Sequence, residues 1–254
     1  MATINCKNCT HQFEGNFCNS CGQSSHTHEI NLHFVAHEIQ HGIIHIDRGF
    51  FYTIKELFTR PGNTIREYID GKRIGHFKPL AFLLIISTVY AFLSHLLKDQ
   101  PYIESVMIGF KSVPDNKNST TPYVVVDWII AHYAYTSLLI IPISSLASYL
   151  AFIKSRYNYI QHLVLNSFQS GQVTVFHIIY LFFTYLVNKN NPSYTLDIIE
   201  IAIGFMLTCW TYYQFFDTMN GARKILLTVV NYILFIILIT LCFVMLLLLS
   251  KALI

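Results

Sequence analysis

The stretch PLAFLLIISTVYAFLSHLL, residues 79 to 97, decides the class of this protein because it holds no Asp, Glu, Lys or Arg. A helix that crosses a bilayer needs about 20 mostly apolar residues. The whole chain is biased in the same way, with 53% hydrophobic and 12% charged residues and a mean hydropathy of +0.44. Charged residues make up about a quarter of an ordinary soluble domain. The sequence therefore predicts an all-α membrane protein.

Four further apolar blocks follow this first one. They run from Trp128 to Ile153, from His162 to Val187, from Ile198 to Phe216 and from Ile225 to Ser250. Each is long enough to span a bilayer, although the third carries polar residues through its first half. Together the five blocks predict a five-helix transmembrane domain over residues 79–254.

Basic residues gather before the first span, in a set that we call the basic collar. It consists of Arg48, Lys55, Arg60, Arg66, Lys72, Arg73 and Lys78. Short loops rich in Lys and Arg stay in the cytoplasm, so we expect a cytoplasmic N-terminus and, with five spans, a C-terminus on the other side. We also expect the first span to act as the insertion signal, since MATINCKNCTHQFEG has no apolar core. The collar suits lipid head groups better than nucleic acid, because the net charge is only +3.

Four cysteines at the front of the chain form two C-x-x-C pairs, Cys6 with Cys9 and Cys18 with Cys21. Two such turns aim four sulfurs at one ion and complete a tetrahedral zinc site. Disulfides would conflict with the cytoplasmic side, and a redox pair would need a thioredoxin-like fold that so few residues cannot form. The sequence therefore predicts a structural zinc ribbon in residues 1–25, with Phe13 and Phe17 as a minimal core.

The stretch FVAHEIQHGIIH, residues 34 to 45, contains the H-E-x-x-H pattern of zinc metalloproteases. In those enzymes the two histidines bind zinc and the glutamate activates a water molecule. Here the pattern belongs to a helical stripe formed by His33, His37, His41 and His45. No third ligand of the extended protease pattern follows, and the helix precedes the first span. A polar stripe on an amphipathic helix is favoured; metal binding by the stripe, or a protease with Glu38 as base, remain the alternatives.

The third apolar block carries polar residues near one helical face: His162, Asn166, Gln169 and His177. Polar side chains within a bilayer either hydrogen-bond to neighbouring helices or line a pathway. The first interpretation is favoured, and a transporter or channel is the alternative. No block is expected to bury the acidic pair common in proton-coupled carriers, because Asp197, Glu200 and Asp217 lie near predicted span ends.

Between the ribbon and the first span, DRGFFYTIKELFTRPGNTIREYIDGKRIGHFKP, residues 47 to 79, has an apolar face that suits a helix in the head-group region. Characteristic positions are the four cysteines, Asp47-Arg48-Gly49, Arg60-Pro61-Gly62, Arg66-Glu67-Tyr68, Gly71-Lys72-Arg73, Phe77 and Pro79. On these residues the first third of the chain resembles a family of uncharacterised membrane proteins, mostly from Bacteroidota, with an N-terminal zinc ribbon. The resemblance implies a bacterial inner-membrane location but does not indicate any activity. The H-E-x-x-H motif is not part of the family pattern.

The expected organisation is thus a zinc ribbon at 1–25, amphipathic cytoplasmic juxtamembrane helices at 26–78 and the five-helix domain at 79–254. The favoured function is a non-enzymatic scaffold or regulator whose zinc ribbon and basic collar contact a protein partner or the lipid bilayer. A transporter that uses the polar face of the third span is one alternative. A membrane metalloprotease is the other.

Overall fold

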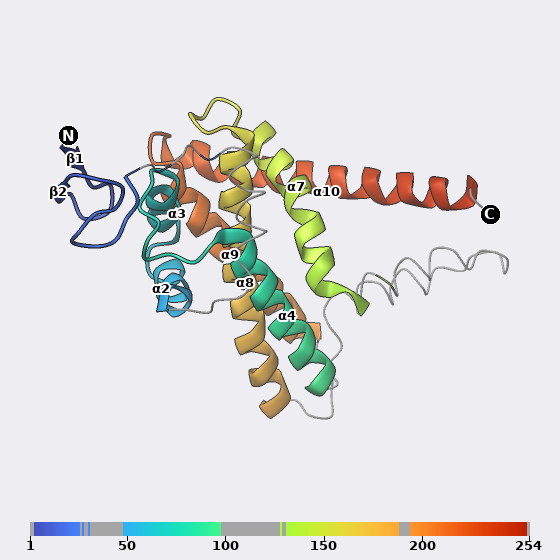
Figure 1. Cartoon of the computed structure of the whole chain (residues 1–254). Helices are drawn as coiled ribbons and strands as arrows, with labels where there is room; N and C mark the ends of the chain where they lie inside the picture. The colour runs from blue at the N-terminus through green and yellow to red at the C-terminus, as the bar shows by residue number, and fades with distance from the viewer. Residues whose placement is uncertain are drawn as a thin grey trace.

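The computed structural model describes residues 3–25, 27, 30, 48–97, 128, 131–187 and 194–252. Its elements are β1 (Ile4–Asn5), β2 (Gln12–Phe13), α2 (Arg48–Leu57), α3 (Pro61–Ile69), α4 (Pro79–Leu97), α7 (Tyr133–Ala151), α8 (Tyr159–Val187), α9 (Tyr194–Phe215) and α10 (Gly221–Ala252). The predicted mostly helical fold is confirmed, with a small antiparallel hairpin, β1–β2, beside the helices (Figure 1). The stripe His33, His37, His41 and His45 lies outside the described residues.

Within the described residues, four helices are long and apolar enough to cross a membrane, namely α4, α7, α8 and the part of α10 from Gly221 to Leu246. A helix also forms at the predicted fourth span, but this 22-residue α9 is not among the four. It carries Asp197 and Glu200 in its first turns, whereas α4, α7 and α8 hold no Asp, Glu, Lys or Arg. The chain is therefore described as a multi-pass membrane protein, and the count of five spans depends on α9.

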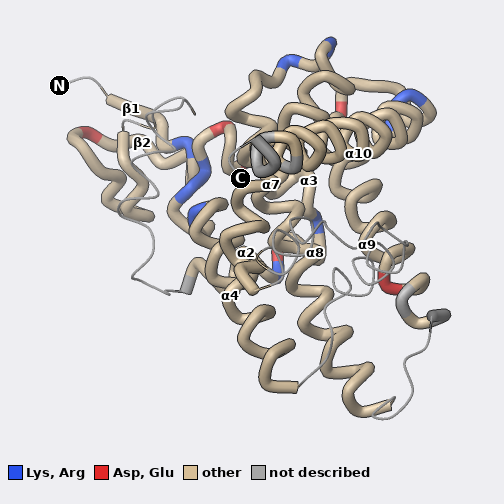
Figure 2. Tube along the Cα trace, turned by 90° about the vertical axis from the view of Figure 1, so that its right-hand side faces the viewer, with Lys and Arg blue, Asp and Glu red and all other residues tan. Residues whose placement is uncertain are grey.

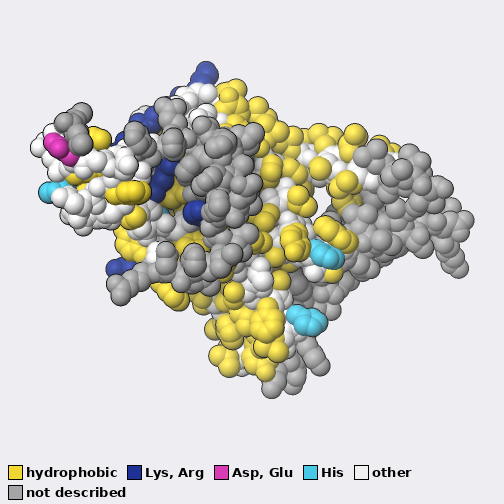
Figure 3. All heavy atoms as spheres, in the orientation of Figure 1, with side chains coloured by type: hydrophobic (Ala, Val, Ile, Leu, Met, Phe, Trp, Pro, Cys, Tyr) yellow, Lys and Arg dark blue, Asp and Glu magenta, His cyan; other side chains and the backbone are white. Residues whose placement is uncertain are grey.

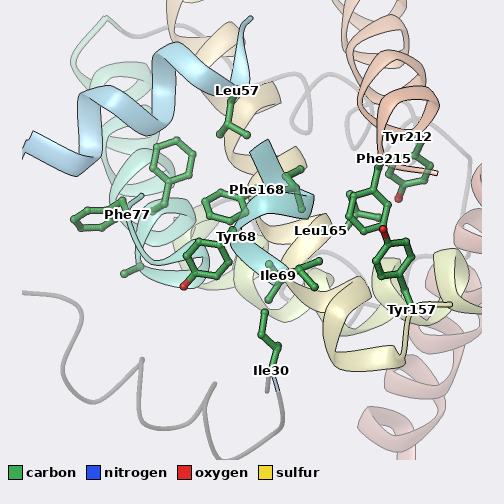
Figure 4. Packing of buried hydrophobic residues seen from close by; sticks show 14 of the residues in the cluster. Ile30, Leu57, Tyr68, Ile69, Phe77, Tyr157, Leu165, Phe168, Tyr212 and Phe215 are labelled. Carbon is green, nitrogen blue, oxygen red and sulfur yellow. The ribbon is translucent and has the colours of Figure 1, made fainter. Parts of the chain in front are cut away.

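Helix α8 lies at the centre of the bundle and packs against α4, α7 and α9. Its Phe168 is fully buried, and the Phe168 and Tyr68 ring centroids lie 5.2 Å apart (Figure 4). Leu57 of α2 and Ile65 of α3 are also fully buried in this core. The two short helices before the first span therefore insert their apolar faces between the long helices. The apolar face expected at the head groups consists of Phe50, Phe51, Ile54, Leu57 and Phe58, and of these Phe51 alone is exposed, at 71%.

The connections α7–α8 and α9–α10 meet α3 at one end of the bundle. The rings of Phe152 and Phe216 stack with centroids 3.8 Å apart, and those of Tyr157 and Phe215 lie 4.4 Å apart. Arg66 of α3 forms an ion pair with Asp217 in the α9–α10 connection. Most of the Lys and Arg residues that the structure describes lie toward this end of the molecule (Figure 2). The two connections and the juxtamembrane helix α3 are thus neighbours in space.

Apolar side chains cover much of the surface of the long helices. Figure 3 shows them over a broad region of the bundle. Helix α10 is the extreme case, since it extends away from the other helices (Figure 1) and only 6% of its most apolar window is buried. In water such a surface would favour aggregation, whereas in a bilayer the acyl chains cover it.

Candidate functional site

The four cysteines of the N-terminal segment form one compact cluster. Their Sγ atoms all lie within 4.8 Å of one another, with Cys6 and Cys21 at 3.5 Å and Cys9 and Cys18 at 3.6 Å. A tetrahedral zinc ion with Zn–S bonds of about 2.3 Å separates its sulfurs by about 3.8 Å. All six cysteines of the chain lie in the described part, and none forms a disulfide. The cluster therefore has the geometry to hold one metal ion.

Two matching turns produce this cluster. The amide of Thr10 donates to the carbonyl of Cys6 at 2.9 Å, and the amide of Gly22 donates to that of Cys18 at 2.8 Å. Gly22 has a φ of +78°, in the left-handed region that favours glycine. Phe13 is buried beside the cysteines as predicted, whereas Phe17 is 67% exposed and is not part of the predicted core. Because this core is so small, the sulfur cluster holds the hairpin together.

The environment of Cys6 favours the metal-binding form of its thiol. Burial alone would raise the pKa of Cys6, but the backbone amides of Cys9 and Asn8 and the neighbouring thiols hydrogen-bond to it. These bonds lower its pKa to about 7. The His11 backbone lowers the pKa of Cys9, but burial and the neighbouring thiols outweigh it and raise this pKa to about 11. The thiolate is the form that binds metal, and Cys6 is the thiol of this pair that ionises more readily.

The polar face of α8 connects α8 to the helices on either side. Ser148 of α7 lies 2.9 Å from Nδ1 of His162 and accepts a hydrogen bond of 2.8 Å from Asn166. The Tyr212 hydroxyl of α9 donates to Asn166 Oδ1 at 2.8 Å. Farther along, Gln169 donates to Thr208 of α9 at 2.7 Å. Three of the four predicted polar residues therefore make bonds between helices.

Gln172 extends this face to the juxtamembrane segment. Its amide nitrogen donates to the Leu57 carbonyl at 2.7 Å, and its oxygen accepts from the Thr211 hydroxyl at 2.8 Å. One buried amide thus joins the end of α2 to α8 and α9. The sequence shows Gln172 as one more polar residue of the third span, but it contains no signal for the Leu57 carbonyl as its partner.

His177 lies apart from the other three predicted polar residues. Its Nε2 is 3.7 Å from Oε1 of Glu200, and its ring centroid is 6.0 Å from that of Tyr90. Glu200 is only 8% exposed, although the sequence placed it near a span end. The packing of α8 on α9 brings this acid and base together inside the bundle.

Three arginines of the basic collar face other parts of the protein. Arg60 binds Glu56 and forms two bonds to Glu67, at 2.9 and 3.2 Å. Arg66 pairs with Asp217, and Arg73 donates to the Tyr68 carbonyl at 3.2 Å. These three guanidinium groups hold α2, α3 and the end of α9 together, so the collar is only partly available to lipid.

The bundle and the cysteine cluster define a multi-pass membrane protein with a candidate metal-binding segment before its helices. Residues 47–91 match a protein family described as a protein of unknown function (DUF3667). This match covers α2, α3, the connector to α4 and the first part of α4. No curated protein and no solved structure matches the chain. The similarity therefore lies in the segment that contains the paired arginines.

Proposed function

We propose that this chain is a non-enzymatic protein of a bacterial inner membrane, with its N-terminus in the cytoplasm. In this proposal the four cysteines bind one structural zinc ion. The zinc ribbon, together with the exposed part of the basic collar, contacts a protein partner or lipid head groups. The observation that carries the proposal is the cysteine cluster itself. Four sulfurs fill a tetrahedral zinc ion and leave no position for a catalytic water.

The surfaces available for contact lie on the ribbon and at the basic end of the bundle. Phe17 of the ribbon and Phe51 of α2 are large exposed apolar side chains, 67% and 71% exposed. Lys55, Lys154 and Arg156 are exposed as well. Each such cation near an anionic bilayer contributes about 1 kcal/mol of attraction. The exposed cations thus favour a lipid contact at this end, and the exposed rings favour a protein contact.

Transport is the second candidate, and the pair of His177 with Glu200 is the observation that favours it. An acid and a base 3.7 Å apart, of which Glu200 is buried and His177 half-buried, can exchange a proton inside a bundle. The hydrogen bonds of His162, Asn166 and Gln169 to other helices instead support a structural role for the rest of the polar face. Proton or cation flux into proteoliposomes that is lost in His177→Gln would favour this candidate over the scaffold.

The proposal is tested on the purified full chain loaded with cobalt. Four thiolates should give intense charge-transfer bands and the visible spectrum of a tetrahedral sulfur site, with one cobalt per chain. Zinc should displace the cobalt and abolish the bands. An octahedral oxygen or nitrogen spectrum, or no bound metal, would overturn the proposed zinc ribbon. Reporter fusions at residues 30 and 254 test the topology, and the proposal requires them on opposite sides of the membrane.

A further inference from the structure

The second metal-binding turn places a glutamine on the connector between α3 and α4. Gln23 follows the Cys18–Cys21 turn, and its backbone carbonyl accepts from the Cys18 amide at 2.8 Å. Its side-chain oxygen accepts from the backbone amides of Arg73 and Ile74, at 3.2 and 3.1 Å. The residue is only 5% exposed. The turn that carries two metal ligands therefore also fixes the acceptor for two connector amides.

The first metal-binding turn contacts the same connector. Lys7 lies between Cys6 and Cys9, and its Cδ atom would be 2.9 Å from a Cβ placed on Gly71. Gly71 also has a φ of +108°, a backbone conformation that residues other than glycine rarely adopt. Glycine at this position therefore permits both the backbone turn and the close approach of the ribbon. Both halves of the cysteine cluster thus rest on residues 71–74.

The connector in turn is bound to the core of the bundle. Arg73 donates to the Tyr68 carbonyl and lies 5.6 Å above the Tyr68 ring, which packs on Phe168 of α8. The amide of Phe77 donates to the Thr53 hydroxyl at 2.7 Å just before α4 begins. The connector that the ribbon contacts is therefore itself bonded to the residues that position the start of the first span.

We propose that metal binding by the four cysteines seats the ribbon on residues 71–74 through Gln23, and that loss of the metal releases this connector. The inference rests on the proposed zinc site. A ribbon with so small a core depends on its metal for folding, as small metal-binding domains generally do. When its second turn opens, Gln23 loses its fixed position and the amides of Arg73 and Ile74 lose their acceptor. Metal binding by the cysteines thereby orders residues 71–74, which lie just before the first span.

Amide hydrogen exchange of the full chain in nanodiscs, followed by mass spectrometry, tests this coupling. With zinc bound, the amides of Arg73 and Ile74 should exchange slowly, and a chelator should speed their exchange about tenfold or more. Gln23→Met keeps the length of the side chain and removes the acceptor. Zinc-loaded Gln23→Met should exchange at these two amides as fast as the chelated wild type, and chelation should add little. Gln12→Met, at an exposed position of β2, is the matched control and should behave as wild type.

The outcomes separate the coupling from the zinc site. Metal analysis should give one zinc per chain for Gln23→Met, which shows that its ribbon is still folded. If no variant or wild-type chain binds zinc, the proposed function fails first. If zinc binds, and chelation speeds exchange within residues 6–23 but leaves that of Arg73 and Ile74 unchanged, the zinc site stands and the coupling is wrong.

Discussion

Replacing Gly62 with alanine should force α3 away from α9. A Cβ on Gly62 would lie 2.3 Å from the backbone nitrogen of Phe215, 2.5 Å from Cβ of Gln214 and 2.6 Å from the Gln214 carbonyl carbon. Ordinary contacts between such atoms are about 3.5 Å or longer. The obstructing atoms belong mainly to the backbone of a helix, so no side-chain rotation relieves the clash. Relief requires the two helices to separate by about 1 Å.

This separation should cost about 2–3 kcal/mol of unfolding free energy. Overpacking in a close-packed interior typically costs about 1–3 kcal/mol, and a backbone obstacle places Gly62→Ala at the upper end. Separation also lengthens the 3.2 Å bond from the Gly62 amide to the Gln214 side chain, worth about 1 kcal/mol. Alanine recovers up to about 1 kcal/mol of helix propensity. At about 2–4 °C per kcal/mol, the melting temperature should fall by roughly 4–12 °C.

The assay is thermal unfolding of the purified chain in detergent, scored as the fraction that stays monodisperse after heating. Gly204→Ala, within α9 itself, is the control, because its Cβ would lie an ordinary 3.7 Å from Val173. The control should melt within about 1 °C of wild type or slightly higher. If Gly62→Ala melts with the control, the close approach of α3 to α9 is not present in the protein.

Three further predictions concern the metal site of the cysteine cluster, the buried His76 and the H-E-x-x-H motif. Cys18→Ser should reduce bound zinc well below one per chain by elemental analysis, whereas Cys242→Ser, at an exposed position of α10, should leave it unchanged; equal zinc in both would contradict the site. Burial lowers the pKa of His76, so protonation favours the unfolded chain. The contribution of neutral His76 to stability should be fully present above the unfolded pKa of about 6.5 and should be lost as the pH falls below it. His76→Gln should therefore reduce the loss in melting temperature between pH 7.5 and 5.5. An unchanged pH dependence of the melting temperature in this variant would contradict the prediction. Glu38→Gln should complement a gene deletion at matched expression, and failure to do so with normal insertion would restore the protease hypothesis.

The parts of this molecule that the sequence predicts are the ones encoded locally. An apolar block is contiguous, and two cysteines three positions apart belong to one turn, so the spans and the cysteine cluster need no knowledge of the fold. The partners of Gln23 are about fifty positions away in the chain. No sequence pattern marks a glutamine whose side chain accepts hydrogen bonds from two distant backbone amides. Glu200 lies near the start of α9, as the sequence indicates, but its burial beside His177 comes from the packing of α9 on α8, which no local pattern encodes.

The basic collar shows how one sequence signal can have two physical causes. Charge counting treats Arg60 and Lys55 alike, yet Lys55 is exposed while Arg60 binds Glu67 through two parallel bonds and also binds Glu56. Only a planar guanidinium offers paired donors of that geometry, whereas an ammonium is a single strongly hydrated charge. Arg66 spreads its donors instead: Nη1 pairs with Asp217 and donates to the Phe215 carbonyl, and Nη2 donates to Asn63. Arg66 therefore fastens α3 to the end of α9, Arg60 joins α2 to α3, and Lys55 is the collar lysine whose charge stays exposed.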